Sequence, residues 1–151
     1  MLTPTAAASF DVCSTVAPFG LATKAPPNGN SAAKLLPPKV GRFVREPVAA
    51  SANIPSDEDF NITYRASSAS VFIGLSRPGS DADLKEAIRT SWTDAVSDKT
   101  NNRAGEKICL ATAPYYYHIP DFIAWTRGPY FLYADASSPA VLAEFMRDFP
   151  Y

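Results

Sequence analysis

The chain has 151 residues, of which 46% are hydrophobic, 12% aromatic and 19% charged, and its formal net charge is -1 at pH 7. A chain of this length and apolar content can bury a sizeable core without a structural metal, so we expect one globular domain. The near-neutral charge and the lack of a Lys/Arg cluster argue against a nucleic-acid partner, and no run of apolar residues is long enough to predict a transmembrane segment.

The first third of the chain is rich in proline. Seven of the fourteen prolines lie within residues 1–50. Residues 1–36 show neither helical nor strand periodicity, so we predict a Pro/Ala/Ser-rich arm or linker there, followed by a single domain over residues 37–151. The start, MLTPTAAASFDVC, lacks the basic and apolar stretches of a secretory signal, so an exported form would already have lost its signal.

The residues after the arm alternate between apolar and polar side chains. Residues 39–46 predict one short edge strand, which Pro47 ends. The segments 60–67 and 69–77 place apolar residues at every second position and predict a β-hairpin.

Two segments have helical instead of strand periodicity. Apolar residues over 81–97 form one stripe, and Ser80 is a candidate N-cap. A second helix is predicted to begin at Pro139, with Ser138 as its cap, and to end before Pro150.

Three strands are predicted between the helices, over residues 106–119, 121–127 and 130–136. The order of elements predicts an α+β domain with an antiparallel sheet of about six strands in a βββα–βββα plan. Because each helix has one apolar stripe, we expect both helices on one face of this sheet.

The segment from residue 113 to 137 holds the only histidine and most of the candidate site residues. Aromatic side chains on neighbouring strands stabilise a sheet by about 0.2–1 kcal/mol per pair, which predicts a structural role. Aromatic side chains with polar tips also bind partners and line ligand pockets. The candidate ligand-binding or partner-binding residues are Tyr115, Tyr116, Tyr117, His118, Trp125 and Tyr130.

No constellation in the sequence predicts catalysis. His118, with Asp121 three residues later, would suit a general base oriented by a carboxylate, but no G-x-S-x-G motif supplies a nucleophile. The spacing of Cys and His does not match a metal site, and the glycines do not form a phosphate-binding loop. We therefore predict no catalytic residue, metal or cofactor. The acidic residues 57–59 predict a solvated loop, and the pair Asp81 and Asp83 predicts a helix start.

Two stretches resemble a known group of proteins. LLPPKVGRFVRE, and AWTRGPYFLYADAS running into FMRDFPY, resemble uncharacterised bacterial extracytoplasmic domains, often lipoproteins. Members of that group begin with Leu-Leu-Pro and a Gly-containing strand, and close with a Trp-x-Arg-Gly-x-Tyr-Phe strand and a helix. The resemblance covers about residues 34–151 and implies a location in the periplasm or at the cell surface, without a known activity. Cys13 follows Phe-Asp-Val instead of the small residues that precede a lipidated cysteine.

The two cysteines allow two interpretations. In an exported chain an even count predicts a Cys13–Cys109 disulfide, which would tie the arm to a strand. Alternatively both are reduced thiols, and Cys109 is a small hydrophobic core residue.

Two hypotheses for function follow from this sequence. The first is a non-catalytic extracytoplasmic accessory or interaction domain that docks on a protein assembly, or on a second copy of itself, through its arm or an aromatic sheet face. The alternative is a small-ligand binder or enzyme that uses an aromatic pocket around His118. A flat exposed aromatic face favours the first hypothesis, and a deep aromatic pocket with His118 at its base favours the second.

Overall fold

The computed structural model describes residues 18–24, 28–97 and 108–151. Their strands form one antiparallel sheet in the order β1-β2-β3-β4-β8-β7-β6-β5. The strands are β1 (Lys39–Val40), β2 (Phe43–Arg45), β3 (Phe60–Ala66), β4 (Ala69–Ser76), β5 (Ile108–Cys109), β6 (Tyr116–Ile119), β7 (Phe122–Arg127) and β8 (Tyr130–Ala136). The helices are η1 (Pro18–Thr23), α2 (Ala32–Leu35), α3 (Asp81–Ser97) and α4 (Pro139–Asp148).

The sheet is built from two runs of strands that meet at its centre. Strands β1 to β4 precede α3, and strands β5 to β8 precede α4. The last strand of each run, β4 and β8, pair antiparallel from Val71 opposite Ala136 to Ser76 opposite Phe131. The α+β class with an antiparallel sheet is therefore confirmed.

The sheet has eight strands instead of about six, because two predicted strands are each divided. Residues 39–46 form a hairpin of β1 and β2, since Gly41 has a φ of +57° and turns the chain. Residues 106–119 contain the separate strands β5 and β6. The backbone between them includes a cis peptide bond before Pro114, and proline has no N–H to donate to a ladder.

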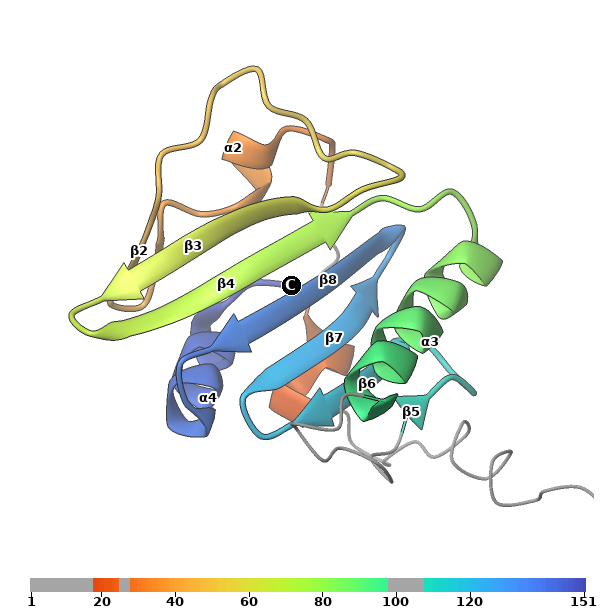
Figure 1. The fold of residues 1–151 in the computed structure, drawn as a ribbon. Helices are drawn as coiled ribbons and strands as arrows, with labels where there is room; N and C mark the ends of the chain where they lie inside the picture. Colours follow the sequence, from red (N-terminus) through yellow and green to blue (C-terminus); the bar gives the residue numbers. More distant parts are fainter. Residues whose placement is uncertain (1–17, 25–27, 98–107) are drawn as a thin grey trace, which may run out of the picture.

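The prediction that both helices lie on one face is wrong. In Figure 1, α3 lies in front of the strands, whereas α4 lies behind them. Leu142 and Phe145 of α4 pack in one core cluster with Ile123 of β7. Leu84 and Ile88 of α3 pack in a second cluster with side chains that point to the other face.

Strands β7 and β8 explain this arrangement because they are apolar on both faces. Ile123 and Trp125 of β7 point to the α4 side, and the alternate residue Ala124 points to the α3 side. In β8, Leu132 belongs to the α4 cluster and Phe131 to the α3 cluster. A sheet with two apolar faces requires a helix on each, as in a three-layer arrangement.

Part of the segment expected to be an arm packs against the domain. Leu21, Leu35 and Leu36 are at most 2% exposed and belong to the α4 cluster. The Lys24 ammonium donates hydrogen bonds to the carbonyls of Met146 and Phe149, at 2.5 and 2.6 Å. Burial lowers the pKa of Lys24 to about 8 although Asp148 acts in the opposite direction. Residues 18–24 thus lie against the end of α4, and Leu35 and Leu36 contribute to the same core cluster, whereas residues 1–17 lie outside the described part of the chain.

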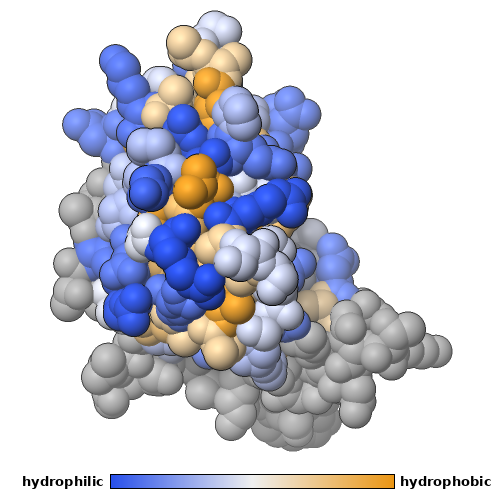
Figure 2. Space-filling model, turned by 90° about the vertical axis from the view of Figure 1, so that its left-hand side faces the viewer, coloured by the Kyte–Doolittle hydropathy of each residue, from blue (hydrophilic) through white to orange (hydrophobic). Residues whose placement is uncertain are grey.

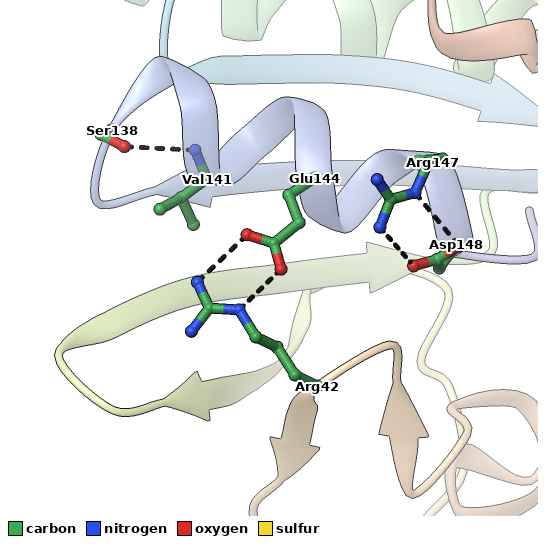
Figure 3. Close-up of polar contacts among 6 residues, drawn as sticks. All are labelled: Arg42, Ser138, Val141, Glu144, Arg147 and Asp148. Carbon is green, nitrogen blue, oxygen red and sulfur yellow. Dashed lines mark hydrogen bonds and ion pairs between the residues drawn. The ribbon is translucent and has the colours of Figure 1, made fainter.

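Polar contacts fix α4 at its start and along its outer side (Figure 3). The Ser138 Oγ accepts a hydrogen bond from the Val141 N–H at 3.2 Å, which confirms the predicted cap. Arg42, in the turn between β1 and β2, donates two hydrogen bonds to the Glu144 carboxylate, at 2.6 and 3.1 Å. The hairpin is therefore anchored to α4.

The side of the molecule that carries α4 and the β3–β4 turn is mostly hydrophilic. Figure 2 shows this side, and the apolar areas visible there are small and lie among hydrophilic side chains. Small isolated apolar areas are normal on a soluble surface and do not indicate a binding site. The candidate site described below lies on the α3 side.

Candidate functional site

The six candidate binding residues do not gather around one cavity. The five tyrosine and tryptophan side chains among them are at most 8% exposed, and they divide between the two faces of the sheet. The α4 cluster contains Tyr116, Trp125 and Tyr130, whereas the α3 cluster contains Tyr115 and Tyr117. Most of this aromatic segment therefore forms core.

Three of these tyrosines use their hydroxyl groups to join elements of the fold. Tyr115 donates to the Asp81 carboxylate at 2.7 Å, and the hydrogen bond with this anion raises the pKa of Tyr115. The Tyr117 hydroxyl bonds the Ser91 hydroxyl at 2.6 Å, and Tyr130 donates to the carbonyl of Gly29. The first two contacts hold α3 on the sheet, and the third holds residues near α2.

His118 is the one exposed member of the set. It lies on β6, and its ring meets the edge of Phe19 with centroids 4.9 Å apart. It does not line either hollow described below. Its role in ligand binding stays a prediction.

The cysteine prediction is only partly within the described residues. Cys109 is 2% exposed on β5, and it has no free thiol in the structure. Cys13 lies outside the described residues. The Cys13–Cys109 bond therefore stays a prediction, which peptide mapping without reducing agent tests directly.

A groove of about 550 Å³ lies on the α3 side of the sheet. One wall is the flank of α3 that carries Asp83, Glu86 and Asp94, and the other is the loop before β3. In Figure 1 this loop and the start of α3 lie at the same end of the sheet. We call this feature the acidic groove because many of its lining residues are aspartate or glutamate.

The floor of the acidic groove is aromatic. It consists of Phe122, Phe131 and Tyr133, which project from β7 and β8. The Phe122 and Tyr133 rings stack with centroids 5.7 Å apart, and Tyr133 donates a hydrogen bond to the Asn61 Oδ1 at 3.0 Å. Gly74 of β4 lies directly beneath the Tyr133 ring, because a Cβ there would come within 2.2 Å of it. A glycine in a strand interior thus makes room for the floor.

The rim of the acidic groove is negatively charged. Among the residues that the structure describes, six carboxylate residues and no lysine or arginine line it, namely Asp57, Glu58, Asp59, Asp83, Glu86 and Asp94. Partial burial raises the pKa of Asp59. Burial, followed by the charges of Asp59 and Asp135, raises the pKa of Tyr133 to about 12. The groove therefore combines negative potential with aromatic rings, the two features that favour a cation.

The carboxylates of the rim do not form a metal site. Within residues 18–24, 28–97 and 108–151, no group of three His, Cys, Asp or Glu side chains is arranged to hold a metal ion. Glu86 is paired with Arg89 of the next turn of α3 at 2.6 Å. The charge of one rim carboxylate is thus already compensated, and the remaining carboxylates lie at intervals along the groove.

A second hollow, of about 470 Å³, adjoins the acidic groove and has the opposite charge. Ser56 and Pro78 line both, and Arg77 is the one charged residue among the described residues that line the second. Arg77 is exposed, and its guanidinium lies over the Tyr130 ring at 5.9 Å from the centroid. We call this feature the Arg77 hollow.

The sequence did not predict the acidic groove because its parts are distant along the chain. The sequence predicts a solvated loop at residues 57–59 and a helix start at Asp83, and both predictions describe the local structure. The available signal was the apolar character of both faces of β7 and β8. Without the knowledge that α3 and α4 cover different faces, that signal does not locate the groove.

Comparison with known protein families, with curated proteins and with solved structures finds no match to this chain. Among the described residues, no helix combines the length and the apolar character needed to cross a bilayer. The site must therefore be interpreted from its own geometry.

Proposed function

We propose that the protein is a non-catalytic interaction domain, and that it binds a positively charged segment of a protein partner in the acidic groove. The observation that carries this proposal is the combination of six carboxylate residues with an aromatic floor in one open groove. Lysine and arginine side chains match both features, because their apolar stems pack on aromatic rings and their charged ends reach carboxylates.

An extended peptide fits this site better than a compact ligand does. The groove is open along the side of α3 from Asp83 to Asp94, so its charges extend over several helical turns. The aromatic surface also continues beyond the groove to Phe72, which is 38% exposed and lies next to Tyr133. This arrangement supports docking on an aromatic sheet face. We include the extracytoplasmic location in the proposal, on the basis of the resemblance described above.

A binding assay with three peptides of about ten residues tests the proposal. The cationic probe alternates lysine with leucine, and the other two carry glutamate or serine in place of lysine. We expect only the lysine peptide to bind, with an affinity that falls as salt screens the charges. Equal binding of the glutamate peptide would contradict the proposal.

Two double variants locate the binding. Asp57→Asn with Asp59→Asn removes two carboxylates of the groove, whereas Glu144→Gln with Asp148→Asn removes two on the α4 side. If each exposed ion pair contributes about 0.5 kcal/mol, the groove variant should bind about 5-fold more weakly. The control should stay within about 2-fold of the unmodified protein. The same loss in both variants would show that only the net charge matters.

A further inference from the structure

The Arg77 hollow is the strongest feature that the proposed function leaves unused. It is not an isolated depression, because it shares Ser56 and Pro78 with the acidic groove. A chain lying in the groove can therefore continue into the hollow past these two residues.

The Arg77 backbone is anchored and its side chain lies over an aromatic ring, but its charge is not neutralised. Its backbone N–H donates to the Pro55 carbonyl at 2.8 Å, and the Tyr130 ring beneath it is fixed by the bond to Gly29. None of the ion pairs among the described residues includes Arg77. None of the described residues that line the hollow is a carboxylate either. The guanidinium is therefore open to an anion from outside, with which it can form two parallel hydrogen bonds.

We infer that the partner segment carries both charges in a fixed order, with a lysine or arginine in the acidic groove and a carboxylate on Arg77. This inference rests on the proposed function, since it extends the same binding site. Charge complementarity over two adjoining hollows makes binding directional, because a segment in the reverse orientation places its carboxylate among the acidic side chains. A uniformly cationic segment places a like charge beside Arg77.

Selection from a displayed library of random peptides, carried out on the full chain, tests this inference. Peptides selected by the unmodified protein should be enriched in lysine or arginine, and also in aspartate or glutamate at a constant spacing from the cation. Selection on Arg77→Ala should keep the cationic position and lose the acidic one. Selection on Asp57→Asn with Asp59→Asn should weaken the cationic preference.

The outcomes separate this inference from the proposed function. Cationic peptides without a constant acidic position, or with one that Arg77→Ala leaves unchanged, would overturn the inference while the proposed function stands. A set of peptides without cationic enrichment would overturn both. Full displacement of the selected peptides by spermidine at a comparable concentration would indicate that the groove is a polyamine site instead. Self-association of the protein that covers the groove would indicate that a second copy of the chain occupies it.

Arg77→Gln serves as a second variant if Arg77→Ala does not fold, because it keeps most of the side-chain length. We expect a selected peptide to bind either variant about 5-fold more weakly than the unmodified protein, the upper end of the range for one exposed ion pair. A version of that peptide with asparagine or glutamine in place of its acidic residue should bind the Arg77 variants and the unmodified protein with similar affinity. Equal affinity of the acidic and amide peptides for the unmodified protein would contradict the role of Arg77.

Discussion

Gly74 supports the floor of the acidic groove, and replacing it tests the packing on which the groove depends. A Cβ on this residue would lie 2.2 Å from Cε2 and 2.3 Å from Cζ of Tyr133. Ordinary carbon contacts are about 3.5 Å, so the ring would have to move by more than about 1 Å. The stack on Phe122 and the hydrogen bond to Asn61 oppose this movement.

The expected cost follows from two opposing effects. Overpacking costs about 1–3 kcal/mol, whereas replacing glycine in a strand interior gains about 0.5–1 kcal/mol in conformational entropy. Gly74→Ala should therefore lower the free energy of unfolding by about 1 kcal/mol, measured by urea denaturation. In a protein that also carries Tyr133→Ala the clash is absent, and Gly74→Ala should be neutral or stabilising.

Gly79→Ala is the matched control, because the nearest heavy atom to its new Cβ would be the Asp83 Oδ2 at an ordinary 3.9 Å. We expect this change to leave stability within about 0.5 kcal/mol. The reasoning would be refuted if Gly74→Ala had the same cost with and without the Tyr133 ring.

Four further predictions concern the core, a cap and two ionisable groups. Ile88 and Leu142 are fully buried on opposite faces of the sheet, so Ile88→Ala and Leu142→Ala should each lower the free energy of unfolding by about 2–5 kcal/mol. The two losses should be additive in the double variant, as measured by urea denaturation. Ser138→Ala should cost about 1 kcal/mol in the same assay, because it removes the N-cap bond of α4. The pKa of Lys24 is about 8 in the folded protein and 10.5 in a free lysine, so the unfolded chain holds this proton more tightly. The free energy of unfolding, measured relative to that of Lys24→Met, should therefore rise as the pH increases from about 8 to 10.5. Burial raises the pKa of Asp59, so this carboxylate should become protonated at a higher pH than an ordinary aspartate does. On acidification, binding of the lysine peptide should therefore begin to weaken at that higher pH, and Asp59→Asn should abolish this early loss of binding.

Local signals in the sequence were sufficient for α3, for α4 and for the hairpin of β3 and β4. Ser80 caps α3 through a 3.1 Å bond to the Asp83 N–H, and α3 spans residues 81–97 as its apolar stripe predicts. The hairpin of β3 and β4 follows from alternating residues and a short turn. These features depend on neighbours in the sequence, so propensity and period determine them.

The arrangement of the two halves depends on contacts that the sequence pattern does not specify. The pairing of β4 with β8 places Val71 opposite Ala136, two residues that are far apart in the sequence. The strand count changed at Gly41, whose positive φ turns the chain, and near Pro114, which has no N–H to donate to a ladder. The face that each helix covers is set by which side of β7 and β8 its stripe meets, and both sides of those strands are apolar.

The candidate site shows the same division between local and long-range information. The tyrosine-rich segment was prominent in the sequence, but its side chains are mainly core because β6 and β7 are covered on both faces. The acidic groove combines Asp59, a flank of α3 and Tyr133, which tertiary folding brings together. Sequence reasoning could find each component but not their proximity.

The most direct test of the central claim is nuclear magnetic resonance mapping of the lysine peptide on isotope-labelled protein. We predict that the largest amide shift changes occur in residues 56–59, 83–94 and 131–133, which contribute the rim and floor of the acidic groove. Changes centred on His118 would favour a ligand site at β6, and changes centred on α4 or spread evenly over the protein would contradict the account.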